Sequence, residues 1–352
     1  MLSDDIQKQE AGDGSTNLQG KSIVINQGIS YRDAKEIALD VFKANSLELS
    51  QEAAVTAASR AEKLADDFLE NLNEKHQEAI KNLNQPALQM ALFDAQKAYV
   101  TTGDEDLESL LVDILVERAT EENRTIKQIT LDESLKVAPK LTSEQFDVLT
   151  INFLISKTKN SDILSLETLK AYLEKYIIPF VENITNDSSC YEHLAYAGCG
   201  SFMETSTIKP IEELFRTSYQ GVFQKGFAKE EFELEIGDIS KFSNTVMPHF
   251  ELTDKLQINA LNIDMIEKTS TENSYSDTEK NNIIKLFNKY LMNVQEVKEK
   301  VIELNPIMEK LFDLWSSTSM NKFKLTTVGI AIAQANLRSK QGVELDLAVW
   351  VK

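Results

Sequence analysis

Three residues between positions 190 and 199 have side chains that could bind a metal or carry a reaction. They are Cys190, His193 and Cys199, and thiolate and imidazole are ligands that suit zinc. The set offers three ligands rather than four, its spacing matches no zinc-ribbon pattern, and a buried cysteine usually behaves as a small hydrophobic residue. We therefore favour a structural role for these residues, with a zinc site as the alternative; no other cofactor is expected.

The segment that follows contains two glycines and a serine, and it forms a second candidate for chemistry. Gly198, Gly200 and Ser201 fit a tight turn, but the pattern is neither a nucleophile elbow nor a phosphate-binding loop. A cysteine nucleophile needs a histidine base, and His193 is the nearest one to Cys190. The sequence contains no Walker motif, HExxH or GxGxxG, so we assign no catalytic residue and keep an enzyme centred on residues 190–201 as an alternative.

The composition indicates which elements must position these residues. Hydrophobic residues make up 42% and charged residues 26% of the 352 residues, which is an ordinary globular mixture. Only 12 Gly and 6 Pro interrupt long stretches rich in helix-forming residues. We predict a mainly α fold built from multi-helix bundle units, with a short N-terminal β-leader and a small C-terminal β-α-β element.

The net charge narrows the range of partners. A formal charge of −19 repels phosphate backbones and anionic lipid headgroups, so nucleic acid and membrane surfaces are disfavoured as partners. Two cysteines make no disulfide framework, the acidic N-terminus is unlike a secretory signal, and no apolar stretch reaches the roughly 18 residues of a membrane span. We expect a cytoplasmic protein.

The first 29 residues divide into a tail and a β-prone segment. Residues 1–12 are polar and acidic without a period, which predicts disorder. Residues 13–29 surround a β-branched run with Asn, Gln and Gly, and predict one or two short strands. Such strands need a partner surface, either the rest of the fold or the same segment in another subunit. The candidate oligomerisation residues are Leu18, Ile23, Val24 and Ile25.

Residues 30–103 are predicted to form an N-terminal helical hairpin unit. Ser30 can cap a first helix, a second fits residues 51–72, and residues 45–50 would join the two as a turn. A third helix is expected over residues 77–100, after or across Pro86. The first helix carries one apolar stripe with helical spacing, formed by Ala34, Ile37, Ala38, Val41 and Phe42.

Residues 104–268 are predicted to form a central helical domain. Capping boxes are expected at Thr130 with Glu133 and at Thr142 with Gln145. Three short helices over residues 131–176 could resemble a helix-turn-helix, but the third has few side chains suited to reading bases, so a plain bundle is favoured. If nucleic acid were bound, the basic face would be Lys322, Lys324, Arg338 and Lys340.

Residues 269–352 are predicted to begin with a long helix that Ser276 and Glu279 cap and that continues to about Val301. Residues 322–325 then predict a strand, 326–339 a helix, and 344–351 a second strand because Leu345, Leu347, Val349 and Val351 alternate with other residues.

Several stretches of the chain resemble an uncharacterised family of stand-alone, mostly helical bacterial proteins. The resemblance is carried by Ile25 to Tyr31, Ile37 to Asn45 and Arg60 to Glu62, by Val137 to Thr142 and Tyr196 to Ser201, and by Leu325 to Ala333 through Asn336 and Leu337 to Trp350. It implies a bacterial source and, through a loose association, phage-defence settings. It implies no catalytic residues.

These observations lead to one functional hypothesis and two alternatives. We expect a non-enzymatic, self-associating interaction protein, acting as a sensor or effector in bacterial defence against phage, whose partners are a second copy of the chain and another protein. The alternatives are a metal-dependent or cysteine-based enzyme at residues 190–201, and a DNA-associated regulator with a helix-turn-helix-like middle unit.

Overall fold

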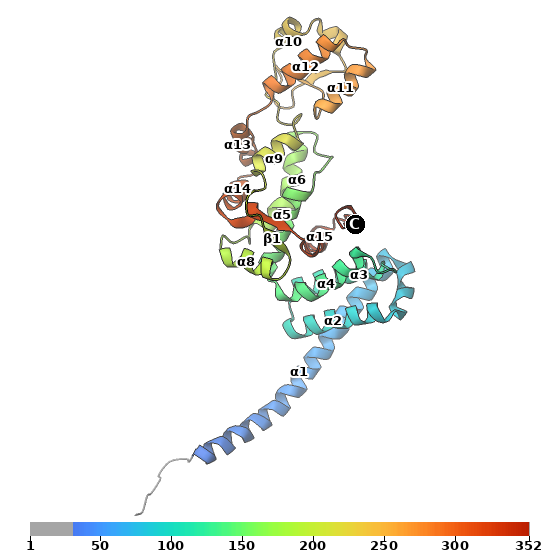
Figure 1. Ribbon diagram of the computed structural model, residues 1–352, viewed down its shortest axis with the longest axis vertical. Helices are drawn as coiled ribbons and strands as arrows, with labels where there is room; N and C mark the ends of the chain where they lie inside the picture. The colour runs from blue at the N-terminus through green and yellow to red at the C-terminus, as the bar shows by residue number, and fades with distance from the viewer. Residues whose placement is uncertain (1–30, 352) are drawn as a thin grey trace, which may run out of the picture. The chain divides into compact units, whose positions relative to one another are not determined.

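A computed structural model describes residues 31–351, with side chains described for residues 52–53, 55–83 and 85–351 (Figure 1). The predicted tail, the β-leader with Leu18, Ile23, Val24 and Ile25, and the predicted cap at Ser30 therefore lie outside the described residues. The chain divides into two units, Met1–Ala58 and Ser59–Lys352. Within residues 31–351, no helix is both long enough and apolar enough to cross a membrane.

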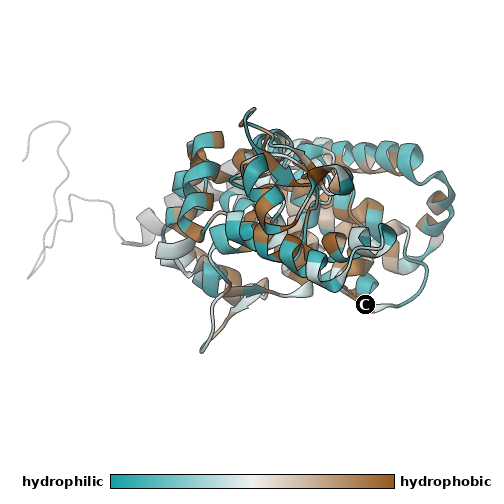
Figure 2. Cartoon of the chain, turned by 90° about the horizontal axis from the view of Figure 1, so that it is seen from above, coloured by the Kyte–Doolittle hydropathy of each residue, from teal (hydrophilic) through white to brown (hydrophobic). Residues whose placement is uncertain are grey.

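The prediction of a mainly α fold is confirmed. The described part of the chain contains fifteen α-helices: α1 (Tyr31–Lys75), α2 (Pro86–Thr102), α3 (Glu105–Ala119), α4 (Ile126–Val137), α5 (Ser143–Lys157), α6 (Leu166–Tyr172), α7 (Ile178–Val181), α8 (Ser188–Tyr196), α9 (Ile211–Ser218), α10 (Lys229–Glu235), α11 (Ile263–Glu272), α12 (Asp277–Tyr290), α13 (Val294–Leu304), α14 (Ile307–Ser317) and α15 (Thr327–Gln341). Most of these helices carry hydrophilic as well as hydrophobic residues (Figure 2).

Two small antiparallel sheets accompany the helices. Strand β1 (Gly200–Phe202) pairs with β4 (Phe323–Leu325), and β2 (Val246–Pro248) pairs with β3 (Leu256–Ile258). The predicted strand at residues 322–325 is therefore present. Its partner comes from residues 200–202 rather than from the C-terminus.

The predicted second C-terminal strand, over residues 344–351, is wrong. Gly342 ends α15 with a φ of +64°, and a short 3₁₀ helix follows at Leu347–Val349. The side chain of Asp346 caps this turn by accepting the N–H of Ala348 at 2.9 Å. Leu347 and Val351 are buried, whereas Val349 between them is 60% exposed. The buried residues are therefore four positions apart, and not two as in a strand with one buried face.

In the first unit, all described residues from Tyr31 to Ala58 belong to α1. The predicted turn at residues 45–50 is wrong, because the helix passes through this segment without a break. Neither Gly nor Pro occurs there, and Asn and Ser each cost only a few tenths of a kcal/mol in a helix interior.

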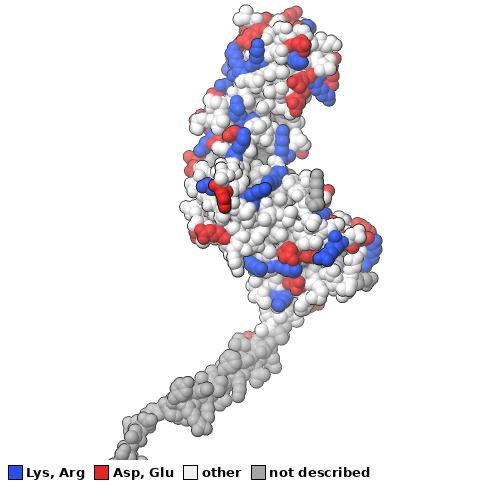
Figure 3. Space-filling view, in the orientation of Figure 1, with Lys and Arg blue, Asp and Glu red and all other residues white. Residues whose placement is uncertain are grey.

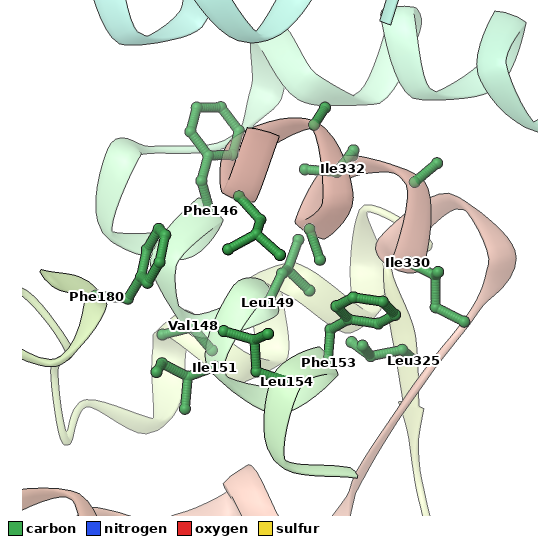
Figure 4. Close-up of a cluster of buried hydrophobic side chains, with 14 of the residues drawn as sticks. Phe146, Val148, Leu149, Ile151, Phe153, Leu154, Phe180, Leu325, Ile330 and Ile332 are labelled. Atoms are coloured by element: carbon green, nitrogen blue, oxygen red, sulfur yellow. The ribbon is translucent and has the colours of Figure 1, made fainter. Parts of the chain in front are cut away.

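In the second unit, the larger of two cores is centred on α5 and α15 (Figure 4). Helix α5 is buried from Gln145 to Ile155, and α15 from Gly329 to Leu337. Many other helices contribute to this core, among them α3, α4, α7 and the end of α1, where Leu64, Phe68 and Leu72 are buried. A smaller core joins α10, α11 and α12 to the β2–β3 hairpin and contains Phe227, Phe232, Phe242, Ile258 and Phe287.

Capping determines several helix boundaries, two of them as predicted. The capping boxes at Thr142 with Gln145 and at Ser276 with Glu279 are both present. The box at Thr130 is wrong, because α4 begins one turn earlier, where Thr125 accepts the N–H of Gln128. The prediction of one long helix after Ser276 is also wrong. Two helices, α12 and α13, are present, because Asn293 and Glu296 form a further capping box at which α13 begins.

A buried polar network joins α5 to α15. Asp147 is completely buried, and its Oδ1 accepts hydrogen bonds from Lys340 Nζ at 2.7 Å and Asn336 Nδ2 at 3.0 Å. Asn336 also donates to Thr150 Oγ1 at 2.9 Å. Lys340, which was assigned to a basic C-terminal face, is therefore paired with a carboxylate. Arg338 is paired as well, as described below, so this face does not offer four free cations.

Candidate functional site

The predicted metal and cysteine residues lie at the junction between α8, β1 and α15. Cys190 and His193 are on α8, Cys199 follows it, and both thiols are free and buried. His193 faces Gln145 of α5: its Nδ1 lies 3.1 Å from Gln145 Oε1, an acceptor, so Nδ1 carries the proton. Among residues with described side chains, no group of three or more His, Cys, Asp or Glu is arranged to hold a metal ion, so these three residues are not grouped as ligands.

Burial makes both thiols poor nucleophiles. It raises the pKa of Cys190 to about 11 and that of Cys199 to about 12, while a hydrogen bond with Gln145 opposes the rise at Cys190. Both cysteines are therefore protonated at neutral pH. Because the thiolate is the reactive form, neither is a strong nucleophile there.

We expect both thiols to react slowly with an aromatic disulfide reagent in the folded protein. At pH 8 the raised pKa of Cys190 alone reduces its thiolate fraction about 100-fold relative to an ordinary thiol, and limited access slows Cys199 further. The labelling rate should increase as the pH rises toward 11, and both thiols should react at once in guanidinium chloride. Fast labelling of the folded chain at pH 8 would contradict the burial of these residues.

The two glycines of this segment have different roles: Gly200 permits close packing, and Gly198 adopts a positive φ. A Cβ on Gly200 would lie 2.3 Å from the Phe323 ring, so the β1–β4 pair requires glycine there. Gly198 has a φ of +84°, and its carbonyl accepts a hydrogen bond from Thr326 Oγ1 at 2.7 Å. Ser201 is exposed and is the register partner of Lys324. These contacts attach the segment to the N-terminus of α15.

A charged cleft formed by α1, α3 and α15 was not predicted from the sequence. It consists of two cavities of about 270 and 260 Å³ that share Lys75, Asp113 and Arg338. The C-terminal residues Glu344 to Asp346 line the first cavity, and Asp67, Asn71 and Glu108 line the second. We call this feature the charged cleft.

A chain of ion pairs crosses the cleft. Arg338 Nε lies 2.6 Å from Asp113 Oδ2, and its Nη2 lies 2.9 Å from Glu117 Oε2. Lys127 Nζ lies 3.1 Å from both Glu117 Oε1 and Glu121 Oε1. Because these side chains are largely buried, each depends on its partner for compensation of its charge.

Burial and pairing act in opposite directions on these groups. Burial raises the pKa of Asp113, and the nearby guanidinium of Arg338 opposes that rise. Burial lowers the pKa of Lys127, but Glu117 and Glu121 outweigh it, so the pKa is raised overall. Burial also raises the pKa of Glu108, although Lys63 Nζ lies 3.1 Å from its Oε2. The cleft therefore carries charges of both signs, each beside a group of the opposite sign.

Distance in the sequence explains why the cleft was missed. Arg338 directly follows the stretch of α15 that is buried from Gly329 to Leu337, and a charge placed beside such a stretch needs a carboxylate partner. Its partners Asp113 and Glu117 are 225 and 221 positions away. No pattern within one helix can identify them.

The fold and the cleft define a multi-helix protein with a polar, ion-paired cavity beside its main core. A model of an uncharacterised protein family, described only as ":-like", matches residues 28–351. The chain belongs to this family. A search of the curated proteins and a search of the solved structures each found no match. The bacterial source, the stand-alone character and the link to phage defence stay predictions.

Proposed function

We propose that this protein is a non-enzymatic interaction protein that self-associates through the N-terminal part of α1 together with residues 13–29. One observation carries the proposal: α1 is a single helix of 45 residues, and its described side chains between Glu52 and Ser59 are mostly exposed. Val55 is 73% exposed, and Ala53 and Ala58 are exposed beside it.

The sequence of α1 supports a second copy of the chain as the partner. The predicted apolar stripe from Ala34 to Phe42 lies within this helix, and a helix cannot bury an apolar stripe against itself. Pairing two such stripes removes apolar surface from water, which contributes roughly 25 cal/mol per Å². The β-leader, the predicted oligomerisation element, directly precedes the same helix in the sequence, so the two segments of the proposed interface are contiguous.

The state of the candidate site also supports a role in binding rather than catalysis. The thiols of Cys190 and Cys199 are buried and have raised pKa values. The buried charges of the cleft are paired with one another, an arrangement that is frequent in structural networks.

The first test measures the mass of the full chain and of variants by mass photometry at micromolar concentration. We expect the wild type to form an oligomer and the Ile37→Gln, Val41→Gln double variant to be shifted toward the monomer. Leu39→Gln is the matched control, because it makes the same apolar-to-amide change outside the stripe. A chain lacking residues 1–29 reports the contribution of the β-leader.

Circular dichroism checks that each variant keeps its helix content, so that a change in mass reflects association. If the wild type is a monomer at every concentration, self-association is wrong. If Leu39→Gln dissociates the oligomer as strongly as the double variant, the stripe is not the interface.

We further propose that this assembly acts as a sensor or effector in bacterial defence against phage, with another protein as its second partner. The support is the resemblance to bacterial proteins of phage-defence settings. We expect a bacterial host that expresses the full chain to show fewer plaques than one with an empty vector, and the Ile37→Gln, Val41→Gln variant to lose that protection. Equal plaque numbers in all three hosts across a broad phage panel would contradict the role.

A further inference from the structure

A pocket of about 260 Å³ lies on one face of the β2–β3 hairpin, far in sequence from the residues discussed so far. Met247, Phe250, Gln257 and Met265 line it, together with Leu164 from the segment between α5 and α6. We call it the hairpin pocket. Its described lining residues carry no charge, so it favours a neutral ligand.

The register of the hairpin determines which side chains face the pocket. Met247 and Gln257 are directly opposite each other, and successive residues of a strand point to opposite faces. Ile258 accordingly lies in the smaller core, while Met247 and Gln257 face the pocket.

Gln257 gives this pocket a buried polar side chain whose amide oxygen has no hydrogen-bond partner. The residue is 2% exposed. A buried amide oxygen that accepts no hydrogen bond is costly, and a ligand that donates to it would remove that cost.

The rim of the pocket is apolar although it faces solvent. Leu164, Phe250 and Met265 are 48%, 41% and 39% exposed, and all three line the same cavity. Two methionines and a phenylalanine form an adaptable surface for a flat ring, because thioethers and aromatic rings make favourable contacts with aromatic groups.

We propose that the hairpin pocket binds a flat, neutral heteroaromatic molecule whose edge carries a hydrogen-bond donor beside an acceptor, as the edge of a nucleobase does. The Gln257 carboxamide pairs with that edge: Oε1 accepts from the ligand and Nε2 donates to it. Met247, Phe250 and Met265 contact the ring. Glutamine pairs with adenine in this bidentate way in other settings.

Adenine is the probe, and isothermal titration calorimetry with the full chain is the measurement. We expect saturable binding of adenine, and binding roughly 10-fold weaker or more for purine, which lacks the exocyclic amine donor. Gln257→Met keeps the length and shape of the side chain but removes its hydrogen-bonding groups. It should weaken adenine binding by a similar factor.

The matched control is Gln334→Met, which also replaces a 2% exposed glutamine whose amide atoms have no partner, but on α15 and outside the pocket. Both variants remove a buried amide oxygen that has no hydrogen-bond partner, so neither should lower the melting temperature. Binding should be lost only in Gln257→Met. Met265→Ala provides a second variant, with weaker binding expected for adenine and purine alike.

Two results would overturn the proposal. The first is the absence of saturable adenine binding by the wild-type chain. The second is a Gln257→Met variant that is folded and binds adenine as well as the wild type does. Because the pocket is built from the second unit alone, the test is independent of self-association.

Discussion

Replacing Arg338 with methionine should lower the free energy of unfolding by about 3 kcal/mol at pH 7, as measured by a urea titration followed by tryptophan fluorescence. The substitution keeps much of the apolar volume but leaves Asp113 and Glu117 without the guanidinium that lies 2.6 and 2.9 Å from them. Lys75 and Lys127 compensate only in part, since Lys75 Nζ is 3.9 Å from Asp113. Uncompensated buried carboxylates are the main cause of the loss.

The loss should depend on pH in a known direction. Burial already raises the pKa of Asp113, and removal of Arg338 removes the group that opposes this rise. At lower pH the folded variant can protonate the carboxyl group, which removes the buried charge. The destabilisation relative to wild type is therefore smaller at pH 5 than at pH 7.

Lys136→Met is the control for this experiment. It also replaces a cation of an ion pair, but both Lys136 and Glu133 are about half exposed, and such pairs contribute at most about 1 kcal/mol. Equal urea midpoints for the two variants would show that the cleft does not depend on its central ion pair.

Gly329→Ala is the second substitution with a large expected effect. Helix propensity alone would make the Gly329→Ala variant more stable than the wild type by about 1 kcal/mol. A Cβ at this position would lie 2.0 Å from the backbone oxygen of Cys199, which cannot move without displacing the segment that joins α8 to β1. We expect a net loss of about 2 kcal/mol or more, as for other overpacked sites.

The labelling assay provides a second measurement for this variant. Displacement of the backbone at Cys199 should increase the reaction rate of that thiol, while Cys190 stays slow. Gly342→Ala is the comparison, because its Cβ meets nothing within 4 Å and only the φ of +64° opposes it. A Gly329→Ala protein as stable as wild type would contradict the close packing of this residue.

Local chemistry predicted much of the helical architecture. The capping boxes at Thr142 and Ser276 were predicted because both partners lie within four residues of each other. The errors have local physical causes too. Asn293 interrupts a helix that the apolar pattern alone would continue, and Asp346 caps a turn where the alternation of apolar residues suggested a strand.

The candidate sites were less accessible to sequence reasoning. Cys190, His193 and Cys199 were singled out by their residue types within ten positions, but the partner of His193 is Gln145, 48 positions away. The pairing of Arg338 with Asp113 and the assembly of the hairpin pocket from Leu164 and residues 221–265 likewise depend on long-range contacts. The residue types indicated that these polar side chains need hydrogen-bond or ion-pair partners, but they did not indicate which residues the partners are.

The α5–α15 pair also determines when the protein can finish folding during its synthesis. Helix α5 is complete at residue 157, but the helix that covers it ends at residue 341, and the bond from Asn336 to Asp147 spans 189 positions. At about 5–20 residues per second, a ribosome needs on the order of 10 s or more to produce that interval. Until then α5 can pack against α7, but it lacks α15, its most extensive neighbour, and Asp147 Oδ1 lacks the donors Lys340 and Asn336. A nascent chain stalled before residue 327 should therefore be a preferred substrate for chaperones.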